Sequence, residues 1–161
     1  MRRRRLLFSA FAIAACSAGM ANAANVTSMK PESMVLALQN SGYKAVLDKT
    51  SDGDPLIKTG ADGNTIFVVI TDCSNNKSCT TAEFVGVWDC SKTPDKCKKV
   101  ADKFNSEESP VHVLMTDNNK TATTYSYLLF DENGISEELF IKNLTTFSYY
   151  NNQFTLEVGK N

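Results

Sequence analysis

Short apolar runs bounded by turn residues predict six strands along this chain. They cover residues 43–50, 55–60, 65–71, 82–89, 111–117 and 123–131. The third and fourth runs are apolar at both odd and even positions, which is typical of central strands in a sheet. Asp52-Gly53 and Asp62-Gly63 favour tight turns on either side of the second strand, because aspartate and glycine adopt turn conformations readily.

Three stretches with apolar residues at helical spacing flank these strands. The first begins at Pro31 and ends before Gly42, Thr93 and Pro94 fit the start of the second, and the third begins near Ser136. Their predicted buried positions are Met34, Val35, Ala37 and Leu38; Cys97, Val100, Ala101 and Phe104; and Phe140, Leu144, Phe147, Phe154 and Val158, widened by Ile135, Leu139 and Tyr150.

The predicted elements follow one another in the order α-β-β-β-β-α-β-β-α. This order predicts an α+β fold, with an antiparallel sheet and helices packed on one side of it. No Gly/Ser-rich linker, repeat or low-complexity tract divides the chain. We therefore expect residues 31–161 to form a single domain, after a short polar lead-in at residues 24–30.

The first 23 residues have the pattern of a secretory signal peptide. Four arginines precede an apolar run that is too short to span a bilayer, and Ala-Asn-Ala at residues 21–23 fits the cleavage rule. We expect residues 1–23 to be removed and the mature protein to be periplasmic or secreted. No second apolar run is long enough for a membrane helix, so we expect no integral membrane span after signal removal.

A second cleavage site lies earlier in the same segment. Ile-Ala-Ala-Cys at residues 13–16 resembles a bacterial lipobox. Cleavage there would leave Cys16 as a lipid-modified first residue and anchor the protein to the cell envelope. Lipidation at Cys16 is therefore the alternative to a free mature chain.

Removal of the signal peptide makes the chain acidic. Lys+Arg falls from 17 to 13 while Asp+Glu stays at 18, which gives a net charge of about −5. Such a charge disfavours nucleic acid and anionic membrane surfaces as partners.

The remaining cysteines are Cys73, Cys79, Cys90 and Cys97. Thiols pair in the oxidising compartments that exported proteins reach. The spacings contain no C-x-x-C, so neither a zinc-knuckle pattern nor a thioredoxin-like redox motif is present. Local pairing of Cys73 with Cys79 and of Cys90 with Cys97 is favoured, although four cysteines allow three connectivities. We interpret them as structural disulfides.

No catalytic, metal or cofactor site is predicted. A Ser-His-Asp or Cys-His site would need His112, the only histidine, which lies in a strand pattern where a structural role is favoured. The EF-hand pattern and a Gly-rich phosphate loop are absent. Turn contexts account for the acidic residues that stand out, which are Asp52, Asp54, Asp62, Asp131 and Glu132.

The last helical stretch carries an aromatic cluster of Phe147, Tyr149, Tyr150 and Phe154. Core packing is the favoured interpretation, because aromatic residues at helical spacing usually face a core. A groove that binds a partner is the alternative.

Several segments, taken in order, resemble the YbjN domain family, a bacterial family related in fold to type III secretion chaperones. They are "LALQNSGYKAVL", "GDPLIKT", "TIFVVITDC", "CTTAEFVGVW", "KFN", "LLFDENGISEELF" and "TFSYYNNQF". The chain departs from the family where "NSEESP" replaces a frequent Trp-Asn pair, and in its second cysteine pair, Cys90 and Cys97. The first departure puts in doubt any function that depends on that segment.

The resemblance implies a YbjN-like, secretion-chaperone-like fold and a protein without an established reaction. The family has been linked to sensory regulation and motility, so we expect an exported, non-catalytic, protein-binding or chaperone-like envelope module. A sheet edge can accept a partner strand, and self-association is expected because relatives in fold often act as dimers. The alternative is a small-molecule sensor that binds between the sheet and the last helix. A carboxylate-dependent hydrolase is least favoured.

Overall fold

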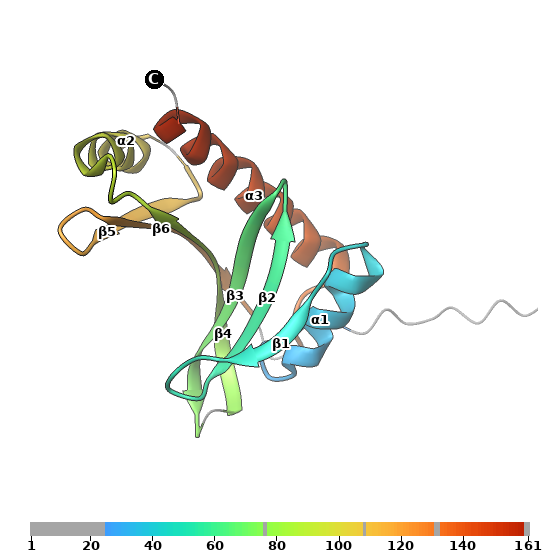
Figure 1. Ribbon diagram of the computed structural model, residues 1–161. Helices are drawn as coiled ribbons and strands as arrows, with labels where there is room; N and C mark the ends of the chain where they lie inside the picture. Colours follow the sequence, from blue (N-terminus) through green and yellow to red (C-terminus); the bar gives the residue numbers. More distant parts are fainter. Residues whose placement is uncertain (1–24, 76, 108, 131–132, 160–161) are drawn as a thin grey trace, which may run out of the picture.

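The computed structural model describes residues 25–75, 77–107, 109–130 and 133–159. The helices are α1 (Pro31–Asn40), α2 (Pro94–Ser106) and α3 (Glu137–Gly159). The strands are β1 (Val46–Lys49), β2 (Pro55–Ala61), β3 (Asn64–Ser74), β4 (Lys77–Asp89), β5 (His112–Thr116) and β6 (Thr121–Leu129). Figure 1 shows their arrangement. The predicted signal peptide, residues 1–23, and the lipidation candidate Cys16 lie outside the described residues.

The strands form one sheet in the order β1-β2-β3-β4-β6-β5. All neighbouring strands are antiparallel. The long strands β3 and β4 lie at the centre, as their apolar pattern predicted. The α+β class and the antiparallel sheet are confirmed, and the elements follow the predicted order.

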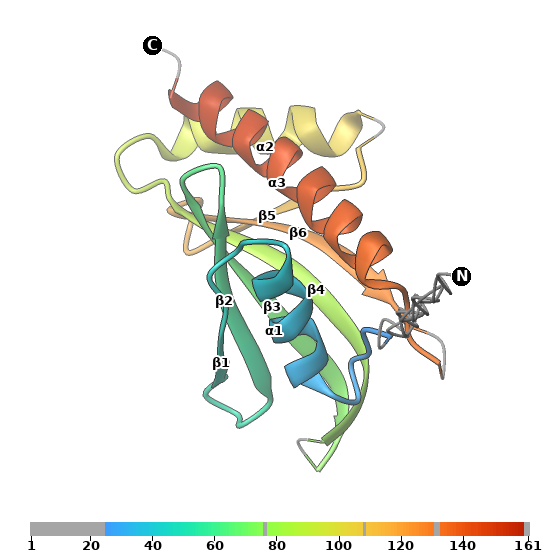
Figure 2. The same ribbon diagram turned by 90° about the vertical axis from the view of Figure 1, so that its right-hand side faces the viewer.

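One face of the sheet, here called the inner face, is covered by helices. Its buried side chains include Ile57, Ile66, Val68, Ile70, Ala82, Phe84 and Ala122. α1 and α3 lie on this side of the sheet, and α2 lies beside α3 over β5 and β6 (Figures 1 and 2). Within the described chain, the opposite side, here called the outer face, carries no helix.

The inner face holds two core clusters, and α3 closes both of them. In the first cluster the ring of Phe84 lies 5.6 Å from that of Phe140 and 5.8 Å from that of Phe147. In the second cluster Phe154 meets Phe104 of α2 edge-on at 5.7 Å. Each buried ring contributes roughly 1.5–3 kcal/mol, so these contacts fix α3 along its length.

A buried polar contact centred on Asn151 lies where α3 crosses β4 and β6. Asn151 Oδ1 accepts hydrogen bonds from Thr124 Oγ1 at 2.6 Å and from Trp88 Nε1 at 3.2 Å. Gly86 leaves room for this contact, because a Cβ at that position would overlap Asn151 Oδ1. Buried polar groups need such partners, so the contact specifies how the helix crosses the sheet.

The segment before α1 is joined to the domain by hydrogen bonds. The Val26 N–H donates to the Ile135 carbonyl at 2.8 Å, and the Ile135 N–H donates to the Val26 carbonyl at 2.9 Å. Val26 and Ser28 are both buried, and Ser28 Oγ donates to the Cys79 carbonyl at 2.6 Å. The sequence suggested only a polar lead-in over residues 24–30, whereas its described part is packed against the fold.

The cysteines form the two local pairs. Cys73–Cys79 joins β3 to β4 across their hairpin, and Cys90–Cys97 joins the residue after β4 to the first turns of α2. Cys97 is fully buried, as the helical spacing predicted. Paired thiols agree with an exported protein. No helix in the described part of the chain is long and apolar enough to cross a membrane.

Some predicted details of the helices differ from the structure. Five of the residues predicted to be buried are only half-buried: Val35, Val100, Ile135, Tyr150 and Val158. Leu139 is 46% exposed. Each helix contacts the sheet along a narrow stripe, so apolar residues at the margins of that stripe stay in solvent. Thr93 stands at the N-cap of α2, but its side chain makes no capping hydrogen bond.

Candidate functional site

The sheet ends in two edge strands, β1 and β5. An edge strand has a row of backbone N–H and C=O groups with no neighbouring strand, and it pairs readily with another chain unless it is protected. The two edges of this sheet differ in whether these groups have partners.

At β5, the side chain of Asn105 occupies the position of a neighbouring strand. The Val113 N–H donates to Asn105 Oδ1, and Asn105 Nδ2 donates to the Val113 carbonyl, both at 2.8 Å. Just before the strand, the Val111 N–H donates to Ser109 Oγ at 3.1 Å. Phe104 is buried in the second core cluster and holds the end of α2, and with it Asn105, at this edge. The β5 edge is therefore protected at Val113.

At β1, the backbone faces solvent on its open side. The Thr50 N–H donates to the Asp54 carbonyl at 2.9 Å, and hydrogen-bonded positions alternate along an antiparallel pair. The backbone groups of Leu47 and Lys49 therefore point away from β2. The Lys49 N–H meets the Asp48 carboxylate at 2.9 Å. Among the described residues, none forms a hydrogen bond with the backbone of Leu47 from the open side.

The side chains of β1 are exposed as well as its backbone. Val46 is 65% exposed and Leu47 is 39% exposed. Natural edge strands are usually protected by charges within the strand, and here Asp48 and Lys49 form the second half of β1 while Val46 and Leu47 form an apolar first half. One end of the edge is closed, because Gln39 Nε2 donates to the Ala45 carbonyl at 3.1 Å. The open edge is thus short and centred on Leu47.

A groove of about 570 Å³ lies beside this edge, between β1, the start of α1 and the start of β4. This volume lies within the usual range of ligand pockets, roughly 300–1,000 Å³. Its apolar lining consists of Met29, Pro31, Leu47, Pro55 and Cys79. Its polar lining consists of Ser28, Glu32, Asp48, Lys49 and Ser78, with Gly53 in the turn.

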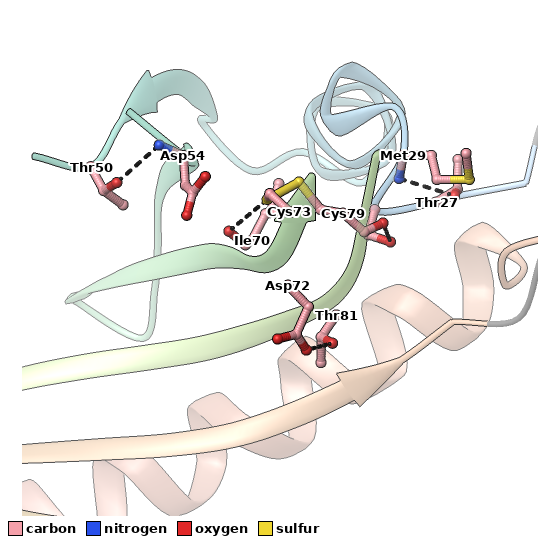
Figure 3. Close-up of a disulfide and its surroundings, with 10 residues drawn as sticks. Thr27, Met29, Thr50, Asp54, Ile70, Asp72, Cys73, Cys79 and Thr81 are labelled. Carbon is pink, nitrogen blue, oxygen red and sulfur yellow. Dashed lines mark hydrogen bonds between the residues drawn. A yellow bond between two sulfur atoms is a disulfide. The ribbon is translucent and has the colours of Figure 1, made fainter. Parts of the chain in front are cut away.

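Local hydrogen bonds and a disulfide hold the walls of the groove (Figure 3). The Asp54 N–H donates to Thr50 Oγ1 at 3.1 Å, which shapes the turn between β1 and β2. Cys79 lines the groove and is bonded to Cys73, and its carbonyl accepts the hydrogen bond from Ser28. A site held in place in this way loses little entropy when a ligand binds.

The aromatic residues of α3 do not form a single groove. Phe147 and Phe154 are buried, one in each core cluster. Tyr150 is half-buried between the clusters, and Tyr149 is 58% exposed, with its ring 5.2 Å from that of Tyr150. Of the four residues, only the two tyrosines reach the surface. The two phenylalanines contribute to the core, as the favoured interpretation of the sequence expected.

The residues considered for catalysis are far apart or differently engaged. His112 lies exposed at β5, with its ring 5.8 Å from that of Tyr125. The buried hydroxyl of Ser148 donates to Asp62 at 2.6 Å, from α3 on the inner face. Since His112 pairs across the strands with outer-face residues, it cannot bridge that serine and a carboxylate as a triad requires.

In the described ranges, no group of three or more His, Cys, Asp or Glu side chains is arranged so that it could bind a metal ion. Asp131 and Glu132, two of the acidic turn residues, lie outside the described residues. The arrangement at the β1 edge offers hydrogen bonds and an apolar groove, which suit binding.

Asn105 and Leu47 are the residues that sequence reasoning missed. Asn105 belongs to the "KFN" segment, but a polar residue at the end of a helix gives no signal of which strand it will meet. Leu47 has the apolar character of any strand residue, and its exposure depends on the order of strands in the sheet.

Comparison with protein-family models and with curated proteins finds no match for this chain. The resemblance to the YbjN family therefore rests on the quoted segments, and the function is argued from the geometry of the edge and its groove.

Proposed function

We propose that this protein is an exported, non-catalytic binding module that accepts an extended segment of a partner protein as an extra strand beside β1. In this mode of recognition, backbone hydrogen bonds supply affinity and side-chain pockets supply specificity. Leu47 offers its backbone N–H and carbonyl, and the adjoining groove receives a side chain of the partner. Membership of the YbjN family, a chaperone-like or regulatory role and a periplasmic location are parts of this proposal.

The contrast between the two edges carries the proposal. Asn105 satisfies the outward backbone groups of Val113 at β5, whereas the backbone of Leu47 at β1 remains open beside two exposed apolar side chains. Unprotected edges lead to unspecific pairing, so a protein that protects one edge and leaves the other open has a use for the open one. The groove supports the same interpretation, because it lies where a bound segment would project its side chains.

The partner's chemistry follows from the groove lining. Met29, Pro31 and Pro55 favour a large apolar side chain. Glu32 and Asp48 outnumber Lys49 among the charged residues, which favours a basic residue next to that apolar one.

Leu47→Pro tests the proposal. Proline removes the N–H of Leu47, which faces the open side and is not bound by Asp48 as the Lys49 N–H is, and it leaves the hydrogen bonds to β2 intact, which is the position where a strand tolerates proline. The tagged wild-type and variant proteins are crosslinked in cells, purified and compared by quantitative mass spectrometry. We expect a partner that wild type captures in near-equal amount to be lost from the variant.

Leu47→Thr is the matched control, since it removes the same side chain but retains the N–H, and it should keep most of the partner. Circular dichroism and thermal melting confirm that both variants fold. Recovery of wild-type protein alone, or equal capture by Leu47→Pro, would contradict strand addition at β1.

The groove also favours a second candidate function, a small-molecule sensor. Its volume suits a small ligand, but it lies beside β1 and not between the sheet and α3, where the sequence placed it. A ligand that binds only the native state raises the melting temperature. A ligand screen by melting, with Leu47→Arg to fill the groove, tests this function, and a shift that Leu47→Arg leaves unchanged would place the ligand elsewhere.

A further inference from the structure

The outer face of the sheet carries large apolar side chains that no helix in the described chain covers. Five of them are more than half exposed: Val46, Val87, Leu114, Tyr127 and Leu129. The exposed apolar residues of the helices, such as Leu36 and Leu156, lie singly and far apart. Apolar side chains gathered on one face indicate an interaction surface.

The strand register aligns these side chains in rows. One row crosses all six strands through Val46, Lys58, Phe67, Val85, Tyr125 and His112. The next row contains Asp48, Leu56, Val69, Glu83 and Tyr127. The rings of Tyr125 and Tyr127 meet edge-on at 5.7 Å and join the two rows. Cross-strand neighbours lie about 5 Å apart, so the rows form one continuous surface.

Three charged side chains lie within these rows: Asp48 on the edge strand β1, and Lys58 and Glu83, which have opposite signs, on either side of the central strand β3. Lys58 is on β2 and Glu83 is on β4, with Phe67 and Val69 of β3 between them. Asp72 lies close enough to Glu83 to interact with its charge. Within the described chain, neither Lys58 nor Glu83 forms an ion pair. The surface therefore carries its own complementary charges.

We propose that the partner of the outer face is a second copy of this chain, packed face to face about a twofold axis that runs along β3. In a twofold interface the same patch serves both copies, so residue i meets residue j and residue j meets residue i. An axis along β3 sets β2 of one copy opposite β4 of the other. Lys58 of each copy then lies within reach of Glu83 of the other, around a centre formed by Phe67, Val69 and Val85.

Known sheet packing is compatible with this arrangement. Two sheets stacked face to face keep their strands within about 30° of each other and lie about 10 Å apart. The two copies have parallel central strands under this axis, so their twist matches. Helix α3 and the apolar lining of the groove stay outside the interface, with only Asp48 at the border of both, and the dimer does not depend on strand addition at the edge.

Charge-reversal variants at Lys58 and Glu83, measured alone and as a mixture, test the proposal. The mature wild type, Lys58→Glu and Glu83→Lys are each measured by sedimentation over a concentration series, and the two variants are also mixed in equal amounts. We expect a wild-type dimer and at least about tenfold weaker association of each variant alone, because each homodimer then opposes like charges. The mixture should associate as wild type does, since both charge pairs are restored in the heterodimer.

A control variant separates this surface from others. Leu129→Asp places a charge on the outer face and should leave a monomer, whereas Leu156→Asp on the exposed side of α3 should not change association. A wild type that remains monomeric at its highest attainable concentration overturns the proposal. If Leu129→Asp dimerises as wild type does, the assigned surface is wrong. If Lys58→Glu and Glu83→Lys dimerise as wild type does, or if their mixture associates as weakly as each variant alone, the assigned charge pair is wrong. Loss of partner capture by Leu47→Pro, with dimerisation unchanged, would show that edge and face act separately.

Discussion

The side-chain amide of Asn105 forms two hydrogen bonds with the backbone of Val113, one as acceptor and one as donor, both 2.8 Å long. It thereby replaces a strand at one edge of the sheet. At the other edge, no residue of the described ranges does the same for Leu47. This asymmetry between β5 and β1 is the observation on which the proposed strand addition rests.

Replacement of Asn105 should both destabilise the protein and open the β5 edge. Asn105→Ala leaves the N–H and C=O of Val113 without partners, which should lower the free energy of unfolding by about 1–2 kcal/mol. Denaturant unfolding measures this loss, and light scattering measures the association expected of an unprotected edge.

Two further variants define the cause. Asn105→Asp keeps the acceptor but loses the donor, so it should fall between wild type and Asn105→Ala. Ser106→Ala removes a local hydrogen bond to the Lys103 carbonyl at the same helix end and should change stability by less than about 0.5 kcal/mol. Equal stability of Asn105→Ala and Ser106→Ala would show that the contact to β5 contributes nothing.

Gly86 should be intolerant of any side chain. A Cβ at this position overlaps Asn151 Oδ1 and lies 2.6 Å from Thr124 Oγ1, so Gly86→Ala displaces the buried polar contact under α3. We expect a loss of about 2–3 kcal/mol, the scale of an overpacked core. Gly159→Ala is the control, because nothing lies within 4 Å of its added Cβ. Chemical denaturation of both variants, followed by the fluorescence of Trp88, gives the comparison.

The two disulfides should contribute similarly to global stability but protect different parts of the chain. Each closes a short loop, with sequence separations of 6 and 7, so loss of either should cost roughly 2 kcal/mol on loop-entropy grounds. Paired replacement of Cys90 and Cys97 by alanine should raise hydrogen exchange in α2, because this bridge fastens the helix to β4. Replacement of Cys73 and Cys79 should raise exchange around the groove and leave α2 protected. The same exchange pattern in both variants would contradict this division.

Glu83 should reduce stability at neutral pH. Burial, and then the charge of Asp72, raise the pKa of the Glu83 carboxyl above its usual range. The folded state therefore holds this proton more tightly than the unfolded chain, and that stabilisation is lost as pH rises through the raised pKa. Glu83→Gln should raise the free energy of unfolding at pH 7 slightly, by less than about 0.5 kcal/mol because solvent screens this half-buried carboxylate. It should also flatten the dependence of that free energy on pH above the usual glutamate range.

This measurement is made on dilute protein, so that association does not contribute. Glu138→Gln, an exposed carboxylate on the first turn of α3, serves as the control. A Glu83→Gln profile that runs parallel to that of wild type across this pH range would show that the carboxylate is not destabilised by folding.

Local pattern in the sequence determined much of the fold. The apolar periodicity of α3 identified Phe140, Leu144, Phe147 and Phe154 as buried, and turn residues separated β1, β2 and β3. The short spacings of Cys73–Cys79 and Cys90–Cys97 favoured the pairs that the structure forms. These features depend on neighbours within a few residues, so the sequence alone contains their cause.

Tertiary structure decided the rest, because it depends on residues far apart in the chain. β3 and β4 are apolar on both faces, yet helices cover only one, so which apolar row remains open depends on where α1, α2 and α3 dock. Val26 looked like part of a polar lead-in but pairs with Ile135. Asn105 protects β5 and Leu47 lies at an open edge only because the sheet order places those strands last. Since an edge is defined by the absence of a neighbour, no local pattern specifies it, and packing of the whole chain does.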